Sequence, residues 1–141
     1  MARILSLDYG KKRTGIAVTD PLQLIAGGLA TVSTCNLFEY LTQYVQHEDV
    51  ERIVIGKPLQ TNGAPSENLA RIEQFVNRWR NKMPHIPIIY YDERFTSVLA
   101  HQTMIDAGLH KKARQNKALV DEISATIILR DYLESQRIRH L

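Results

Sequence analysis

Four acidic residues of this sequence either follow an apolar segment directly or lie near the start of a predicted helix. Asp8 closes the first apolar run, Asp92 and Glu93 directly follow a later one, and Asp121 lies early in the last helical pattern. Gathering three carboxylates without cations costs several kcal/mol, by the general scale for close like charges. Magnesium prefers such oxygen ligands. Two ions roughly 4 Å apart can activate a water and stabilise the leaving oxygen of a phosphodiester.

Each acid also has an explanation that involves no catalysis. An aspartate at a strand end is often a turn residue. Glu93 could form a surface ion pair with the neighbouring Arg94, and Asp121 could favour the dipole of its helix. Spacing alone does not show that the acids meet, so the elements that carry them have to be considered.

Hydrophobic periodicity divides the chain into alternating strands and helices. Gly10 is expected to form a turn between the first two strands with positive φ, and Gly27 with Gly28 a bend before the third. The pattern predicts strands at 3–8, 14–19, 29–33, 52–56 and 86–91, and helices at 37–45, 66–79, 96–107 and 117–135.

This order predicts an α/β protein with a mixed five-stranded sheet. Three strands joined by short links favour antiparallel pairing, whereas the later strand–helix–strand units need parallel pairing with helices on the faces. We find no internal repeat and no linker, so residues 1–141 are expected to form a single domain. Asp8 and the pair Asp92–Glu93 then lie at the carboxyl edge of the sheet, where open α/β sheets tend to bind ligands.

The charge pattern permits a nucleic-acid partner. Eighteen Lys and Arg exceed fifteen Asp and Glu, which gives a net charge of +3. The basic residues gather at Lys11, Lys12 and Arg13 and again between Lys111 and Lys117, where they could meet phosphates or form solvated loops. No run of 18 apolar residues exists, so no membrane span is expected. The single Cys35 fits a reducing compartment and a cytoplasmic protein.

Four motifs occur in order and together span most of the chain. They are Asp8-Tyr9-Gly10-Lys11-Lys12-Arg13-Thr14-Gly15, then Gly56-Lys57-Pro58-Leu59 with Asn62-Gly63, then Asp92-Glu93-Arg94-Phe95-Thr96-Ser97, and finally Lys117-Ala118-Leu119-Val120-Asp121. The ordered set resembles the motifs of the YqgF family, whose members resemble Holliday-junction resolvases and are regarded as nucleases that mature the 5′ end of pre-16S rRNA. Lys57 departs from the family pattern, which more often has an apolar residue there. It could contact phosphate or point outward.

The resemblance implies a ribonuclease H-like fold and names the site residues. Asp8, Glu93 and Asp121 carry over as the catalytic and metal-binding acids. Asp92 is the weaker choice because neighbours in an extended segment point to opposite faces, and Glu122 sits about 100° round the helix from Asp121. The expected substrate contacts are Lys11, Arg13, Arg94 and Lys117, although Arg13 could instead form an ion pair and Arg94 could brace Glu93.

The leading hypothesis is therefore an endonuclease that uses Mg²⁺ or Mn²⁺, with two ions, on the 5′ end of pre-16S rRNA. Its alternatives are a resolvase of Holliday junctions or other branched DNA, and a nucleic-acid-binding protein of the same fold without catalysis. A nucleotide-binding kinase or ATPase fragment is weaker, because such folds need two domains of this kind. Oligomeric state cannot be read from the sequence.

Overall fold

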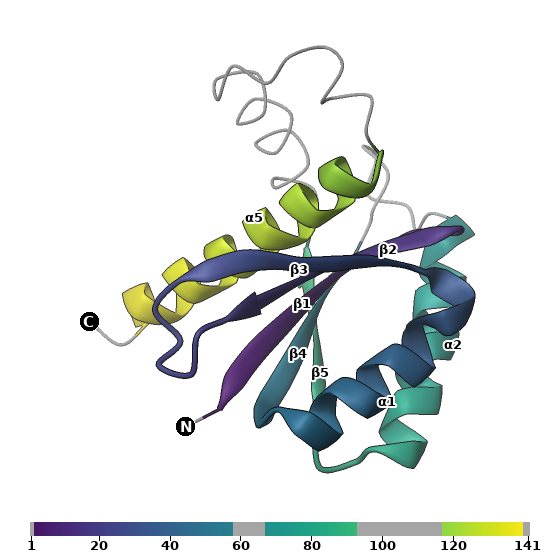
Figure 1. Cartoon of the computed structure of the whole chain (residues 1–141), viewed down its shortest axis with the longest axis horizontal. Helices are drawn as coiled ribbons and strands as arrows, with labels where there is room; N and C mark the ends of the chain where they lie inside the picture. Colours follow the sequence, from purple (N-terminus) through teal and green to yellow (C-terminus); the bar gives the residue numbers. More distant parts are fainter. Residues whose placement is uncertain (1, 58–66, 93–116, 140–141) are drawn as a thin grey trace.

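The computed structural model describes residues 2–57, 67–92 and 117–139, and Figure 1 draws them as helices and strands. Residues 3–33 form an antiparallel meander, and the later strands alternate with helices. A short 3₁₀ turn, Thr34–Asn36, precedes the first helix. The strands are β1 (Arg3–Tyr9), β2 (Arg13–Thr19), β3 (Ala26–Ser33), β4 (Val50–Lys57) and β5 (Ile88–Asp92), and the helices are α1 (Leu37–His47), α2 (Glu67–Lys82) and α5 (Lys117–Arg139).

The sheet has the strand order β3-β2-β1-β4-β5. β1 pairs antiparallel with β2, and β2 antiparallel with β3, whereas β4 lies parallel to β1 and β5 parallel to β4. The predicted mixed sheet of three antiparallel strands followed by two parallel ones is thus confirmed. The continuous apolar stretches of β1 and β4 agree with this arrangement, because helices cover both faces of these central strands.

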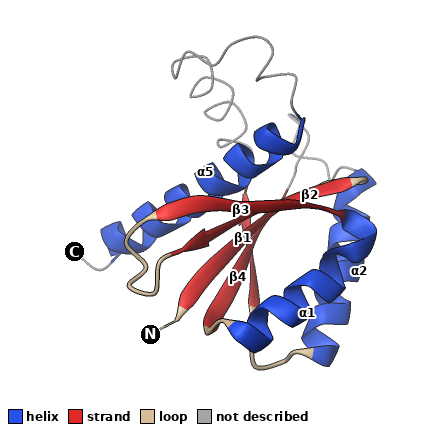
Figure 2. Ribbon diagram, viewed as in Figure 1, coloured by secondary structure: helices blue, strands red, loops and turns tan. Residues whose placement is uncertain are grey.

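One core lies between the sheet and the helices α1 and α2. Figure 2 shows both helices on the same side of the sheet, with α5 on the other. Odd-numbered residues of β1 and β4 enter this core, among them Leu5, Leu7 and Ile53. Trp79 of α2 is fully buried among them, and its indole N–H donates to the carbonyl of Ile86 at 2.9 Å.

A second core lies between the sheet and α5. Even-numbered residues of β1 and β4 supply Ile4 and Val54, and α5 supplies Ala125, Ile128 and Leu129. α5 is held over β1, β2 and β3, at the centre and one side of the sheet, as Figure 1 shows. Its predicted beginning at Lys117 is confirmed, and it continues past the predicted end at Ser135 to Arg139.

One local prediction was wrong. β3 begins at Ala26, so Gly27 and Gly28 lie inside the strand, where the register with β2 shifts between Ile16 and Ala17. The predicted turn at Gly10 is confirmed, between the end of β1 at Tyr9 and the start of β2 at Arg13. A Cβ at Gly10 would collide with the carbonyl oxygen of Arg13, so close backbone approach is what requires glycine in this turn.

The predicted helix over 96–107 lies outside the described residues. Residues 58–66 and the rest of 93–116 lie outside them as well, so a single domain over residues 1–141 stays a prediction. Among the helices that the structure describes, none is long and apolar enough to cross a membrane.

Ser6 links the two central elements of the second core. Its fully buried hydroxyl donates to the carbonyl of Ala125 at 2.5 Å, which joins β1 to α5. We expect Ser6→Ala to lower the free energy of unfolding by about 1 kcal/mol, because a buried hydrogen bond is lost. Urea denaturation measures this change. Ser33→Ala, at an exposed position in β3, is the matched control and should leave stability unchanged; equal losses in both variants would contradict the prediction.

Candidate active site

The end of β1 and the first turns of α5 meet at one glycine. Asp8 is paired in register with Gly15 of β2, and directly opposed residues of an antiparallel pair point to the same face. A Cβ built on Gly15 would collide with the backbone carbonyl of Asp121 and lie 3.0 Å from the Cβ of Asp121. Asp8 and Asp121 therefore flank the same position on the α5 face, and both are half-buried.

Arg13 forms an ion pair with one of these two acids, Asp121. Its Nε–H donates to Oδ2 of Asp121 at 2.9 Å, with 40% of the Arg13 side chain and 21% of the Asp121 side chain exposed. An ion pair this accessible contributes about 1 kcal/mol or less to stability. Its main effect is electrostatic, because the Arg13 guanidinium places positive charge beside Asp121, and Asp8 lies near Asp121.

The turn between β1 and β2 is held in place by two other elements. The Thr34 hydroxyl donates to the carbonyl of Gly10 at 2.6 Å, and its backbone N–H donates to the carbonyl of Lys12 at 3.0 Å. On the far side, the side-chain amide of Asn68 in α2 donates to the carbonyl of Tyr9 at 2.7 Å. These bonds fix the backbone beyond Asp8, and the turn carries Lys11 exposed to solvent.

The structure describes some of the predicted site residues and leaves others outside the described ranges. Asp8, Asp121 and Arg13 are brought together, and Lys11 lies on the turn beside them. Lys117 is the first residue of α5, one turn before Asp121, and its side chain lies outside the described residues. Glu93 and Arg94 lie there as well. Within the described ranges, no three His, Cys, Asp or Glu side chains group so as to hold a metal ion.

The geometry bears on two alternatives that the sequence left open, namely Glu122 in place of Asp121 and the position of Lys57. Glu122 lies over β3, where a Cβ on Gly28 would be 3.4 Å from its own Cβ, so Asp121 rather than Glu122 is the acid beside Gly15. Lys57 places its ammonium 5.7 Å from the centre of the Tyr90 ring. Tyr90 packs against the α1 and α2 core, on the face opposite Asp8. Lys57 therefore does not join Asp8 and Asp121.

The sequence placed Gly15 in the first motif but did not indicate its contact with α5. It also missed Ser6 and the two side chains that hold the turn, Thr34 and Asn68. For Ser6 a signal existed, because Ile4, Ser6 and Asp8 alternate on one face and Ser6 is a polar residue within an apolar strand. The contact of Gly15 with Asp121 joins residues more than a hundred positions apart, and no local pattern reports it.

Gly15 therefore controls the separation of α5 from β2. We expect Gly15→Ala to lower the free energy of unfolding by about 3 kcal/mol, since the added methyl collides with helix backbone that cannot rotate away. Gly27→Ala, where an added Cβ meets nothing within 4 Å, should change it by less than about 0.5 kcal/mol. Thermal or urea unfolding compares the two, and equal stability of both variants would refute the close contact.

Proteins with similar sequences share one name. Proteins named "Putative pre-16S rRNA nuclease" match over almost their full length: that of Phocaeicola vulgatus is 63% identical over 137 residues, covering 97% of this chain and 99% of the relative. That of Flavobacterium johnsoniae is 57% identical over 137 residues, with the same coverage.

The fold is similar to that of solved resolvases. The Fowlpox virus resolvase in complex with Holliday junction DNA superposes with a TM-score of 0.57 at 15% identity, covering 95% of this chain and 98% of that one. RuvC of T. thermophilus superposes with a TM-score of 0.53 at 12% identity, covering 91% and 92%. This likeness establishes the ribonuclease H-like fold that the sequence predicted. The family model described as "RuvX: Holliday junction resolvase" matches residues 2–135, and the chain belongs to this family, which the sequence resemblance called YqgF.

Proposed function

We propose that this protein is a metal-dependent endonuclease that hydrolyses phosphodiester bonds at the 5′ end of pre-16S rRNA, with Asp8, Glu93 and Asp121 as its catalytic acids. The observation that carries the proposal is the contact between Gly15 and the backbone of Asp121, which puts Asp121 beside Asp8. Acids contributed by the first strand and the last helix are what the motif resemblance predicted. The names of the relatives that match nearly the whole chain support the substrate.

The donor set suits a hard divalent cation. The half-buried residues Asp8 and Asp121 both lie next to Gly15, and Asp121 already pairs with the Arg13 guanidinium, so the position favours positive charge. Glu93 is proposed as the third ligand on the motif resemblance alone, because it lies outside the described residues. When bound there, Mg²⁺ or Mn²⁺, as two ions, would supply an activated water and charge stabilisation for the leaving oxygen.

The basic residues around the acids are proposed to bind substrate. Arg13 can exchange its Nε–H bond to Asp121 for contacts with a phosphate, for which a guanidinium is well shaped. Lys11 is exposed on the turn that follows β1, three residues after Asp8, and Thr34 and Asn68 hold the backbone of this turn. Lys117, one helical turn before Asp121, and Arg94 complete the proposed substrate contacts. The free thiol of Cys35 supports a cytoplasmic location.

Holliday-junction DNA is the competing substrate, because the family description names it. Both substrates present phosphates to the same acids, so the site chemistry does not discriminate between them. Discrimination requires RNA-specific contacts such as those to the 2′-hydroxyl, or recognition of shape. A binding protein without catalysis remains the third candidate.

Replacing a catalytic acid tests the proposal. We expect Asp8→Asn and Asp121→Asn each to reduce Mg²⁺-dependent cleavage of a pre-16S rRNA fragment by at least about a hundredfold, because each removes a charged metal ligand. Glu122→Gln is the matched control: it changes the neighbouring acid of α5, which lies over β3, and should retain activity. A cleavage gel with and without EDTA gives the rates.

The same assay separates the candidate functions. Cleavage of a four-way DNA junction in preference to the rRNA fragment would select the resolvase. Unimpaired cleavage by Asp8→Asn would refute the proposed acids. Nucleic-acid binding without cleavage of either substrate, with any divalent metal, would leave only the non-catalytic candidate.

The charge of Lys11 should contribute to nucleic-acid affinity. We expect Lys11→Ala to weaken binding similarly for unrelated sequences and to reduce the slope of log K against log salt by about 0.7–0.9, the value for one lost phosphate contact. Fluorescence anisotropy across a salt series measures both. Lys82→Ala, at the far end of α2, serves as the control, and an equal change of slope in that variant would remove the assignment of Lys11.

A further inference from the structure

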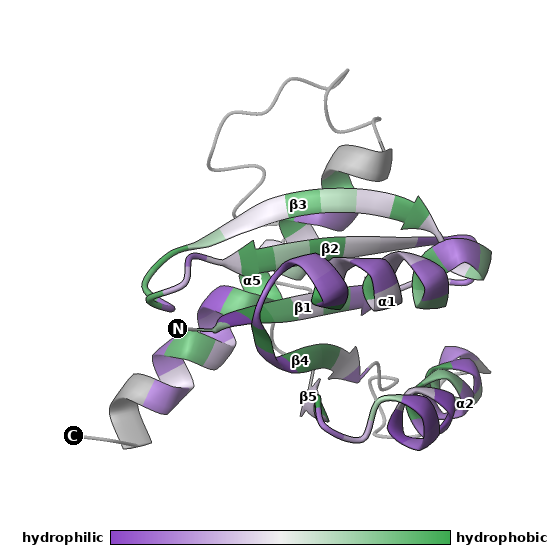
Figure 3. Cartoon of the chain, turned by 60° about the horizontal axis from the view of Figure 1, so that its bottom comes forward, coloured by the Kyte–Doolittle hydropathy of each residue, from purple (hydrophilic) through white to green (hydrophobic). Residues whose placement is uncertain are grey.

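Two basic side chains approach one tyrosine ring at the β5 edge of the sheet. The Lys57 ammonium lies 5.7 Å from the centre of the Tyr90 ring, and the Arg80 guanidinium lies 5.9 Å from it. Lys57 is the last residue of β4, whereas Arg80 comes from the last turn of α2. Figure 3 shows many hydrophilic residues along this helix. We call Lys57, Tyr90 and Arg80 the Tyr90 cluster.

The fold does not require both cations of the Tyr90 cluster. One cation over an exposed face of a tyrosine ring already makes a favourable contact, and a second adds repulsion between like charges. Arg80 is held at this edge because its guanidinium also donates to the carbonyl of Ile88 at 3.3 Å. Arg80 is exposed, and a guanidinium has five N–H donors, so it keeps donors for a ligand.

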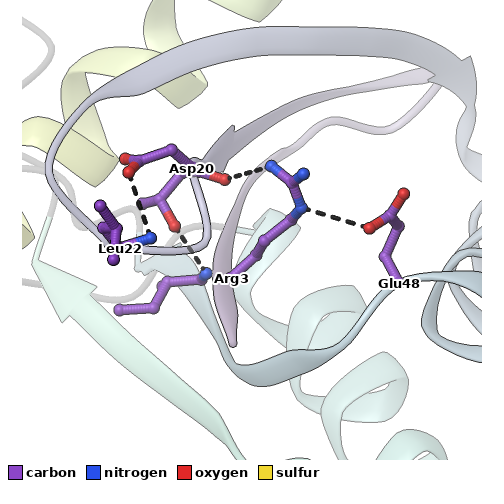
Figure 4. A network of polar contacts seen from close by, with 6 residues as sticks. Arg3, Asp20, Leu22 and Glu48 are labelled. Atoms are coloured by element: carbon purple, nitrogen blue, oxygen red, sulfur yellow. Dashed lines mark hydrogen bonds and ion pairs between the residues drawn. The ribbon is translucent and has the colours of Figure 1, made fainter. Parts of the chain in front are cut away.

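Several arginines elsewhere in the described residues have acidic partners. The Arg3 guanidinium pairs with the carboxylate of Glu48 at 3.3 Å, as Figure 4 shows. Arg13 and Arg52 also form ion pairs with acids. In the part of the chain that the structure describes, neither cation of the Tyr90 cluster forms such a pair. An anionic ligand would relieve the repulsion between them.

One described acid, Glu73, acts on the Tyr90 cluster without pairing. Burial raises the pKa of the Tyr90 hydroxyl, the charge of Arg80 lowers it, and the charge of Glu73 raises it. Lys57 is paired in register with Asp92, whose side chain lies outside the described residues. Among the described side chains, two positive charges therefore lie near one carboxylate.

The Tyr90 cluster lies at the same edge of the sheet as the candidate active site. β1 and β4 are parallel, with Leu7 opposite Ile55. Continuing this register by two residues within both strands places Lys57 beside Tyr9, which directly follows Asp8. Lys57 lies on the α2 face, whereas Asp8 lies on the α5 face. A strand of nucleic acid that reaches Asp8 can therefore continue over this edge to the cluster.

We propose that the Tyr90 cluster binds the phosphate backbone of the substrate, beyond the bond that is cleaved at Asp8. The identity of the ligand as nucleic acid rests on the proposed function. A guanidinium contacts phosphate through two N–H groups and an ammonium as a point charge, so Arg80 and Lys57 suit successive phosphates of one strand. Lys57 stands where the related motif more often has an apolar residue, which makes this contact a feature of this chain rather than of the motif.

RNA binding in EDTA tests the Tyr90 cluster separately from catalysis. We expect Lys57→Ala and Arg80→Ala each to weaken binding of a fluorescent single-stranded RNA about fourfold at about 0.15 M salt, and to lower the slope of log K against log salt by about 0.7, as for one lost phosphate contact. The double variant should lose about fifteenfold and about 1.4 in slope, because the two contacts are independent. Fluorescence anisotropy of the full-length chain measures both quantities.

Two further variants control this measurement. Lys82→Ala removes a cation two positions after Arg80, about 200° round the helix, and should change neither affinity nor slope. Glu73→Gln should tighten binding, because it removes the negative charge that lies near the cluster. Circular dichroism checks that all variants are folded.

Cleavage kinetics test the position of the Tyr90 cluster relative to the cleaved bond. For a pre-16S rRNA fragment, Lys57→Ala should raise KM about fourfold and leave kcat unchanged, since the lost contact binds the substrate and the transition state equally. A short oligonucleotide that does not reach the cluster should be cleaved equally by the variant and the wild type. A loss of fold would instead lower both rates.

The outcomes separate this inference from the proposed function. Salt slopes that Lys57→Ala and Arg80→Ala leave unchanged, or that Lys82→Ala lowers as much, would overturn the phosphate contact. So would a wild type that binds neither the RNA nor a four-way DNA junction. Binding that depends on the Tyr90 cluster, with no cleavage of either nucleic acid, would support the contact and count against the endonuclease alone.

Discussion

The contact of one helix backbone with one strand backbone determines the geometry of this protein. At Gly15 no side chain separates β2 from α5, so the backbone of Asp121 comes directly against the strand. Because Asp8 is the cross-strand neighbour of Gly15, the same contact brings Asp8 and Asp121 to the same position on the α5 face of the sheet. Close packing of α5 on β2 favours this contact, whereas repulsion between the acids Asp8 and Asp121 opposes it. The ion pair of Arg13 with Asp121 offsets part of that repulsion.

The rest of the fold holds α5 at this distance. Ser6 joins β1 to α5 by a buried hydrogen bond, and the apolar contacts of Ile4 and Ala125 continue along the helix. On the other face, α1 and α2 pack against a core of their own, and Asn68 and Thr34 hold the turn that follows Asp8. The end of β1 is thereby fixed from both faces of the sheet.

α5 separates two surfaces by its length. Its first turns carry Asp121, and its C-terminal half carries Arg130 and Glu134 beside the apolar loop after β2. A helix of 23 residues spans about 35 Å, so binding at one end does not obstruct the other.

Local patterns in the sequence determined the elements, their order and the mixed sheet, because periodicity and short connections restrict the topology strongly. They also placed Asp8 at a strand end and Asp121 early in the last helix. Only the tertiary structure decided that Asp121 rather than Glu122 faces Asp8, that Lys57 lies on the opposite face, and that Arg13 bonds to Asp121. Those outcomes depend on the rotation of α5 and the register of the strands, which contacts between residues distant in the chain fix and no neighbouring residues encode.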